Sequence, residues 1–397
     1  MQEAVIVSGV RTAIGRVGGT LKDIEVDYLA AEVIREVLKR SGIPGQSVDE
    51  VIFGHTKQSS DNPNLARLAL LRANMPEEVP AYTVHRQCGS ALTALNNAVQ
   101  SIWAGTSELV MAGGAESMST APYYLRNARY GYRMGNAEIL DSNTESQSRC
   151  QPQDRYGHMT MGMTAENLAE KYNISRQEQD EFAVLSQERA QRAITAGRFK
   201  EEIVPYLIQG KKGIVTYDTD EHPRETSMAQ LAKLAPVFKK DGSVTAGNSS
   251  GRNDAAAVLL VTTPEKAKAY GLKPLARVIG MGAKGVPPQI MGIGPVPATH
   301  AALKMAGLTL DQMDLIELNE AFAAQSLAVI KELGLDVAKT NVNGGAIALG
   351  HPLGATGAII LIKLMNELKR TGKRYGLATM CIGGGQGIST VVENLTY

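Results

Sequence analysis

An internal duplication constrains the fold of this chain more than any other feature, because both ends carry the same series of expected elements in the same order. Strands alternate with amphipathic helices in each half, and a glycine-flanked turn opens a helix near 91–103 in the first half and 355–368 in the second. Such alternation predicts an α/β fold in which each half forms one mixed sheet covered by helices. The strands are expected at 4–8, 51–53, 109–112 and 256–261, and again at 276–279, 315–318, 376–380 and 388–392.

The first half is interrupted by a long insertion that has no counterpart in the second. It includes a polar stretch at 141–154 and an expected helix near 176–196. Long insertions at the strand ends of an α/β core typically cover a ligand site, and an oligomer contact is the alternative. We therefore divide the chain into a first half at 1–117 completed by 251–270, an inserted loop domain at 118–250, and a second half at 271–397.

The charge balance argues against binding to polyanions. The 397 residues include 41 Lys and Arg against 40 Asp and Glu, which provides no global field for nucleic acid or an anionic membrane. No apolar run approaches the roughly 20 residues of a membrane span, and the N-terminus lacks the features of a signal or transit peptide. Three scattered cysteines fit neither a disulfide framework nor a metal site. We expect a cytoplasmic protein with reduced thiols.

Two candidate catalytic residues lie in glycine-rich turns, one in each half. Cys88 precedes Gly89 at the start of an expected helix, where the helix dipole favours the nucleophilic thiolate; a small buried core residue is the alternative. His351 lies in a Gly-His-Pro-Leu-Gly turn that leaves its imidazole room to face a cleft. Histidine is the usual base that activates a cysteine, although a structural turn histidine has the same local sequence.

Two further candidates follow apolar strands of the second half. Cys381 ends one strand and precedes three glycines, so its thiol is placed to exchange a proton with a bound carbon centre; a buried structural thiol is the alternative. Asn319 ends another strand, where it is placed to orient a water or to cap a helix. The duplication places Cys88 and the His351 loop at equivalent positions. Packing the two halves together would bring all four residues into one site.

At these residues the chain resembles the thiolase family over essentially its whole length. The match consists of four motifs in the family's order: the nucleophile motif at Cys88, Asn-Glu-Ala-Phe from Asn319, Gly-His-Pro around His351, and Cys-x-Gly-Gly-Gly from Cys381. The resemblance implies a duplicated fold with two mixed five-stranded sheets in α-β-α-β-α layers and a large loop domain over the coenzyme A site.

The resemblance also implies a role for each matched residue. Cys88 would accept the acyl group, His351 would activate it, and Cys381 would act as acid and base at the substrate α-carbon. Asn319 would hold an oxyanion-hole water, and the N–H groups of Cys88 and Gly383 would form a second oxyanion hole. Positions matching the family's coenzyme A and acyl contacts are Arg224, Ser250, Met161, Ala321, Phe322 and Met291.

The expected activity is acyl-CoA C-acetyl transfer through an acyl-cysteine, by a ping-pong mechanism. The substrates would be acetyl-CoA, acetoacetyl-CoA or another 3-ketoacyl-CoA, and coenzyme A, with no metal or redox cofactor. A decarboxylating ketoacyl synthase is one alternative, and the second cysteine argues against it. A catalytically silent acyl-CoA-binding or lipid-binding relative is the other, and the intact motifs argue against that.

Departures from the family pattern affect the expected acyl-chain preference. His85 stands where the family usually has Asn, Ala91 where it has Gly, and Thr160 where many short-chain members have His. Met291 and the segment 122–135 favour short chains, whereas Thr160 and the segment 151–158 point the other way. The resemblance favours a homotetramer built as a dimer of dimers. We expect the segment 125–136 to form the tetramer contact, with a loop over the coenzyme A site as the alternative.

Overall fold

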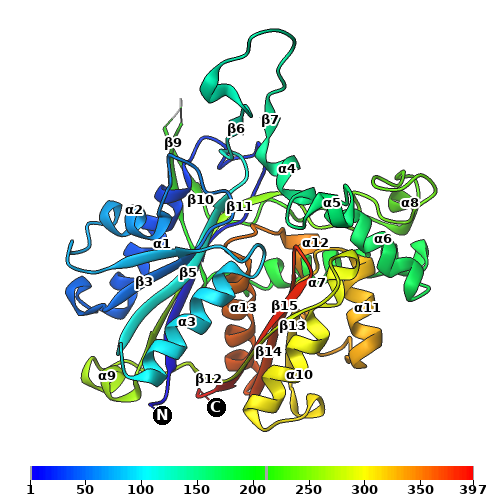
Figure 1. The fold of residues 1–397 in the computed structure, drawn as a ribbon. Helices are drawn as coiled ribbons and strands as arrows, with labels where there is room; N and C mark the ends of the chain where they lie inside the picture. Colours follow the sequence, from blue (N-terminus) through cyan, green and yellow to red (C-terminus); the bar gives the residue numbers. More distant parts are fainter. Residues whose placement is uncertain (1, 211–212, 397) are drawn as a thin grey trace.

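The computed structural model describes residues 2–210 and 213–396, and it has the duplicated α/β architecture that the sequence predicts (Figure 1). The first half contributes five neighbouring strands in the order β4-β3-β5-β11-β1, and the second half contributes four in the order β13-β14-β15-β12. Each predicted strand overlaps an observed one. The strands are β1 (Val5–Thr12), β3 (Glu50–Gly54), β4 (Ala81–Val84), β5 (Leu109–Ser117), β11 (Asn253–Thr262), β12 (Ala276–Gly285), β13 (Leu315–Leu318), β14 (Tyr375–Ile382) and β15 (Gln386–Asn394).

The second sheet differs in one detail from the two five-stranded sheets expected. In the first half, β4 pairs with β3 at the outer edge of the sheet. The equivalent strand of the second half, β13, has no fifth strand beside it among the described residues, but only a single bridge between Ile316 and Thr340. Asn341 follows in the left-handed region at φ 50°. Its side-chain amide bonds the backbone N–H and C=O of Leu318, so a side chain replaces the ladder of a fifth strand. The two sheets also meet edge to edge, through pairing of β1 with β12.

The helices form three layers around these sheets (Figure 1). Helices α3 (Ser90–Ala104) and α13 (Thr356–Thr371) pack on each other and on strands of both halves, which places them in the central layer. Buried residues run without a break over 356–365 of α13, as expected for a helix covered on all sides. The outer layers contain α1 (Val26–Ser41) and α2 (Leu65–Arg72) on the first half, and α10 (Pro295–Ala306) and α11 (Ala323–Leu333) on the second.

The insertion between β5 and β11 lies over the ends of the strands and extends away from the core (Figure 1). The short strands β6 and β7 form a ribbon, and the segment between them projects from the body of the molecule. The elements of the insertion are β6 (Tyr123–Tyr124), β7 (Leu140–Asp141), α4 (Ser142–Ser148), α5 (Gln153–Tyr156), α6 (Met161–Lys171), α7 (Arg176–Thr195), β8 (Ile203–Val204), β9 (Tyr206–Gly210), β10 (Gly213–Tyr217) and α8 (Met228–Leu231). Further short elements are β2 (Gly15–Arg16), α9 (Pro264–Ala269), α12 (Ala346–Leu349) and the 3-10 helices Gly45–Ser47, Ala128–Tyr130, Pro288–Ile293 and Leu310–Gln312.

A buried ion cluster attaches the insertion to the core. Arg11, at the end of β1, is fully buried, and its guanidinium binds both carboxylate oxygens of Asp220 at 2.7 and 2.9 Å. The same group donates to Glu202 at 2.8 Å. Both acids belong to the insertion, and removing one partner of such a buried cluster would leave an uncompensated charge. The cluster therefore fixes the end of the insertion that leads back to the site.

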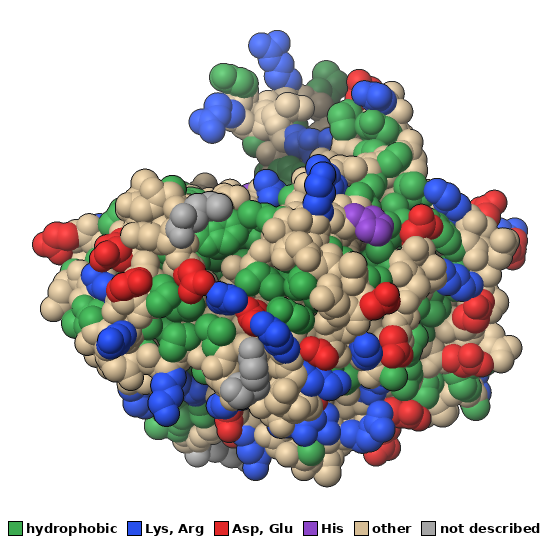
Figure 2. Space-filling model, turned by 90° about the horizontal axis from the view of Figure 1, so that it is seen from below, with side chains coloured by type: hydrophobic (Ala, Val, Ile, Leu, Met, Phe, Trp, Pro, Cys, Tyr) green, Lys and Arg blue, Asp and Glu red, His purple; other side chains and the backbone are tan. Residues whose placement is uncertain are grey.

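The surface carries both signs of charge. Figure 2 shows acidic and basic side chains interspersed over the face that it presents, in keeping with the net charge of +1. Among the described residues, no helix combines the length and apolar character required to cross a membrane.

Candidate active site

Cys88 lies in a tight turn between β4 and α3, directly before the N-cap residue of the helix. Gln87, which precedes it, has φ 45°, a left-handed conformation that non-glycine residues rarely adopt. Ser90 stabilises this turn, because its hydroxyl accepts from the N–H of Arg86 at 2.9 Å and donates to the C=O of Gln87 at 2.6 Å. Strained turns of this kind cluster at active sites. The turn presents the half-buried thiol at the helix N-terminus, as predicted.

His351 lies in the loop between α12 and α13, and its contacts define its tautomer. The Thr356 hydroxyl donates to the C=O of Pro352 at 2.9 Å, so it accepts from His351 Nδ1–H at 2.7 Å. Nε2 then carries the lone pair, and the Asn319 side-chain amide lies 3.4 Å from it. The backbone N–H of His351 donates to Asn253 at 2.9 Å, which fixes the loop itself. His351 is thus held as a base.

A glycine contact brings the histidine loop of the second half against the first half. A Cβ placed on Gly114, in β5, would lie only 2.0 Å from the backbone oxygen of Gly354. The N–H of Gly354 also donates to the carboxylate of Glu116 at 2.8 Å. Only a residue without a side chain permits this approach. The predicted union of the two repeats at one site is therefore realised through β5.

Cys381 and Gly383 lie at the end of β14, on the second half's side of the site. Cys381 is fully buried and packs with Met291 and Ala321. Gly383 lines the same cavity as Cys88, and its backbone N–H acts to lower the pKa of the Cys88 thiol. Gly384, at φ 87°, turns the chain directly afterwards, which lets the glycine run fold back along the site.

Burial decides the protonation of the three reacting groups. It raises the pKa of Cys88 to about 11, although the N–H of Gly383 acts to lower it. Burial also raises the pKa of Cys381, and the nearby Cys88 adds to this effect. It lowers the pKa of His351 to about 4. The expectation that the helix dipole favours a thiolate is therefore outweighed, and both thiols and the imidazole are neutral at pH 7.

A cavity of about 260 Å³ joins these groups. Cys381 and Asn319 lie behind its wall, in contact with residues that form it. The predicted site residues that line the cavity are Cys88, His351, Gly383, Ser250, Met161, Ala321, Phe322 and Met291.

Arg224 does not line this cavity. It borders a separate hollow of about 510 Å³ together with residues of α7 such as Gln187. Its backbone N–H donates to Gln187 at 3.0 Å, and its guanidinium lies 3.4 Å from the C=O of Ala246. The structure therefore brings all the predicted site residues together except Arg224.

Several lining residues escaped the sequence analysis. Cys150 is one of them: it lines the cavity, and a Cβ on Gly383 would lie 3.5 Å from its sulfur. Lys57 lines the cavity as well, from the loop that follows β3. The duplication could have identified this position, because the loop after β3 corresponds to the loop after β13 that carries Asn319. Other unpredicted lining residues are Met118, Asn143, Ser146, Gln147, Phe238 and Arg252.

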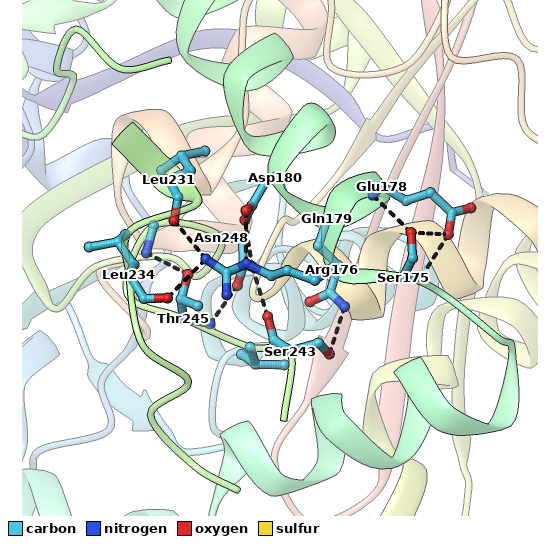
Figure 3. A network of polar contacts seen from close by, with 12 residues as sticks. Ser175, Arg176, Glu178, Gln179, Asp180, Leu231, Leu234, Ser243, Thr245 and Asn248 are labelled. Atoms are coloured by element: carbon cyan, nitrogen blue, oxygen red, sulfur yellow. Dashed lines mark hydrogen bonds and ion pairs between the residues drawn. The ribbon is translucent and has the colours of Figure 1, made fainter. Parts of the chain in front are cut away.

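A polar network in the insertion holds the covering segment of the cavity (Figure 3). Arg176, at the start of α7, donates to the backbone oxygens of Leu231 and Leu234 at 2.6 and 3.0 Å. It also pairs with Asp180 at 2.8 Å, and Asp180 accepts from Asn248 at 2.9 Å. The chain between these anchors carries Phe238 to the cavity wall, and Asn248 directly precedes the lining residues 249–252. Helix α7 thus fixes the cover of the site.

A cysteine at a helix N-terminus, a neutral histidine base and a second thiol, joined in a duplicated α/β fold, define a cysteine-dependent acyltransferase. Family models for the thiolase N-terminal domain and the thiolase C-terminal domain match residues 4–265 and 272–394. The chain therefore belongs to the thiolase family.

Individual relatives agree over their full length. An acetyl-CoA acetyltransferase of Syntrophomonas wolfei is 50% identical, with 99% of this chain and 100% of the relative covered. Beta-ketothiolase BktB of Cupriavidus necator is also 50% identical, with 99% and 100% covered. The crystal structure of the Bacillus anthracis acetyl-CoA acetyltransferase has a TM-score of 0.96 at 48% identity, covering 100% of this chain and 99% of that one. Human mitochondrial 3-ketoacyl-CoA thiolase gives 0.95 at 46% identity, covering 99% of each.

Proposed function

We propose that the protein catalyses the reversible condensation of two acetyl-CoA to acetoacetyl-CoA and coenzyme A, or the thiolytic cleavage of a 3-ketoacyl-CoA, through an acyl group on Cys88. The observation that carries this proposal is the convergence of Cys88, His351 and the N–H of Gly383 at one cavity, with Cys381 directly behind it. The names of the relatives, acetyltransferase and ketothiolase, support the same chemistry in its two directions.

The first half-reaction is acyl transfer to Cys88. His351 Nε2 takes the thiol proton as the sulfur attacks the thioester carbonyl, or the 3-keto carbon in the cleavage direction. Since thiol and imidazole both rest in their neutral forms, proton transfer accompanies the attack. The developing oxyanion is stabilised by the N–H groups of Gly383 and Cys88. The N–H of Gly383 acts to lower the pKa of the Cys88 thiol, which supports this role.

The second half-reaction moves a proton at the α-carbon. In synthesis, the Cys381 proton first passes to His351, the Cys381 thiolate then removes a proton from acetyl-CoA, and the carbanion attacks acetyl-Cys88, which releases Cys88 as a thiol that takes the proton from His351. In cleavage, the departing enolate takes the proton from Cys381, and the Cys381 thiolate then takes the proton of the incoming coenzyme A thiol. The enolate oxygen is stabilised by His351, whose Nε2 carries a proton at this stage, and by a water held by Asn319. The Asn319 carbonyl oxygen is buried and has no protein partner among the described residues, which supports its binding a water. A ketoacyl synthase needs no second thiol, so Cys381 favours the thiolase reaction.

Coenzyme A is expected to enter along the covered side of the cavity. Ser250, Met161 and Phe322 line that side. Arg224, in its separate hollow, would contact a more distant part of the coenzyme. The loop domain 118–250 would act as the cover. We propose that the reaction uses no metal and no redox cofactor, because thioester activation by two thiols and a histidine balances every proton and electron.

The projecting segment 125–136 supports the proposed homotetramer. None of its residues lines the cavity. Tyr130 and Met134 are 93% and 96% exposed, and large apolar side chains that project in this way are typical of protein contacts. We propose that this segment forms the contact between dimers, and that the protein acts in the cytoplasm.

The test is covalent trapping together with activity. Incubation with acetoacetyl-CoA should leave one acetyl group on the Cys88 peptide by mass spectrometry, and added coenzyme A should remove it with formation of acetyl-CoA. Cys150 provides the internal control, because it lines the same cavity. An acetyl group found on Cys150 in place of Cys88 would overturn the assignment.

A further inference from the structure

A buried lysine in the cavity wall is not used by the reaction described above. Lys57 follows β3 and is 7% exposed, yet it shares the cavity with Cys88. Its ammonium donates to the hydroxyl of Ser146 at 2.6 Å and lies 3.4 Å from the C=O of Ser142. An ammonium has three donors, so one remains for the cavity. Burying a charge without a counter-ion is costly, and burial lowers the pKa of Lys57.

Against the effect of burial, Glu116 and Asp141 raise the pKa of Lys57 through space, but neither forms an ion pair with it. Among the described residues, no carboxylate lies within the 4.0 Å of an ion pair with Lys57. Glu116 is occupied by other donors: the N–H groups of Thr56, Lys57 and Gly354, the hydroxyl of Thr56, and His55 at 3.0 Å. Burial opposes its ionisation, but these partners lower the pKa of Glu116 to about 2.

The other neighbouring acid, Asp141, serves as the N-cap of α4. Its carboxylate accepts from the N–H of Asn143 at 2.9 Å and from the hydroxyl of Thr144 at 2.7 Å. Both acids near Lys57 are thus committed elsewhere. Lys57 therefore lies at the cavity with two acids near enough to act on its charge, but with no ion-pair partner among the described residues.

The cavity has two different sides. The wall contributed by the covering segment and the second half is apolar, with Phe238 and Phe322 in edge-to-face contact at 6.1 Å between ring centroids. The wall contributed by the β3 loop and α4 is polar, with Lys57, Ser146 and Gln147. A simple alkyl chain would form no favourable interaction with the polar wall, whereas an acyl chain with an anionic end would form an ion pair with Lys57.

We propose that the acyl substrates are coenzyme A thioesters of short 3-oxo dicarboxylic acids, whose terminal carboxylate binds Lys57 and the Ser146 hydroxyl. This inference rests on the proposed function, since it names the substrate class of the same site. The part of coenzyme A next to its sulfur is uncharged, and its phosphates lie at the far end of a long arm. A cavity of about 260 Å³ has no room for both ends of the coenzyme. An anion bound at Lys57 would therefore belong to the acyl chain.

A purely structural Lys57 is the alternative, because its bonds to Ser142 and Ser146 also hold α4 against the β3 loop. The two roles predict different effects of replacing Lys57 on the activity toward different substrates. Loss of a structural lysine affects every substrate alike. A lysine that binds the acyl terminus affects only substrates that carry the carboxylate.

The experiment compares thiolysis of two six-carbon thioesters, 3-oxohexanedioyl-CoA and 3-oxohexanoyl-CoA, which differ in a terminal carboxylate against a methyl group. The wild-type protein should prefer the first by at least about tenfold in kcat/KM. In Lys57→Met, the ratio of the two values should fall by about 30-fold or more, as expected when one partner of a buried charge pair is lost. Lys39→Met, which changes an exposed lysine of α1, should leave the ratio unchanged.

Several outcomes would overturn the inference. These are a wild-type preference for the methyl-ended substrate, an equal loss on both substrates in Lys57→Met, or a rise in the KM for coenzyme A with a constant ratio. Thiolysis of acetoacetyl-CoA by the same wild-type preparation tests the proposed function separately. If that activity is present and the ratio is insensitive to Lys57, only the substrate class is wrong. If it is absent, the proposed function fails and the substrate class fails with it.

Discussion

Replacing Thr356 by Val is expected to slow the enzyme while leaving the catalytic histidine in place. The Thr356 hydroxyl accepts from His351 Nδ1–H at 2.7 Å, which keeps the lone pair on Nε2, where the base is needed. Valine has the shape of threonine but cannot accept this bond. The variant therefore allows the imidazole to change tautomer or to rotate. It leaves no cavity at position 356, although Thr356 is only 2% exposed, because the valine side chain fills the same space.

The magnitude follows from the groups left without a partner. The C=O of Pro352 still accepts from the N–H groups of Ala355 and Thr356 at 2.8 and 3.0 Å, so only His351 Nδ1–H is orphaned. One unsatisfied buried donor costs about 1–3 kcal/mol of stability. Loss of a partner that orients a functional histidine typically costs about 10- to 100-fold in activity, which corresponds to about 1.4–2.8 kcal/mol in the barrier.

The assay is kcat/KM for acetoacetyl-CoA thiolysis, combined with ¹⁵N NMR of the histidine ring to report the tautomer. Thr356→Ser is the matched control, because it retains the hydroxyl and should stay within about threefold of the wild type. If Thr356→Val keeps wild-type activity, or if Thr356→Ser loses as much as Val, the hydroxyl does not define the tautomer and the argument fails.

Three further predictions address other parts of the structure. Cys381→Ala should still be acetylated at Cys88, while condensation falls by about 10² to 10⁴ and exchange of acetyl-CoA methyl protons with deuterated solvent is lost; rapid exchange in a folded variant would contradict the proposed role. Burial, and then a neighbouring arginine, lowers the pKa of His222 to about 4, so the unfolded chain takes up its proton first as pH falls from about 6.5 to 4. Stability should therefore fall over this range, by up to about 3 kcal/mol from this residue, and urea titrations of His222→Gln should give a flatter pH dependence; an equally steep one would refute it. Gly384→Ala should lower the melting temperature more than Gly383→Ala. Gly384 has φ 87° and its Cβ would lie 2.6 Å from a backbone oxygen, whereas a Cβ on Gly383 would lie no closer than 3.4 Å to another atom. Equal melting temperatures of the two variants would show that the turn tolerates a side chain.

The accuracy of the sequence-based prediction differed between elements. The helices that begin at Ser90 and Thr356 follow glycine-rich turns, and the periodicity of their apolar residues located the start of each to within one residue. The resemblance implied a fifth strand in the second half, where the structure has a single bridge between Ile316 and Thr340, and the side chain of Asn341 replaces further backbone pairing. No local pattern reports such a replacement. Arg224 matched a motif, yet it borders a different hollow from Cys88.

The duplication, the order of the strands and helices, and the identity of the reacting groups could be predicted from the sequence, because short-range patterns of apolar spacing, glycine turns and motifs indicate them. The environment of those groups depends on the tertiary structure. Burial raised the thiol pKa above the value that the helix dipole alone would favour, and Thr356 chose the tautomer of His351. The fold also placed Lys57 at the cavity with no ion-pair partner among the described residues. Each of these properties depends on residues distant in the chain that meet only when the two halves close around the central helices.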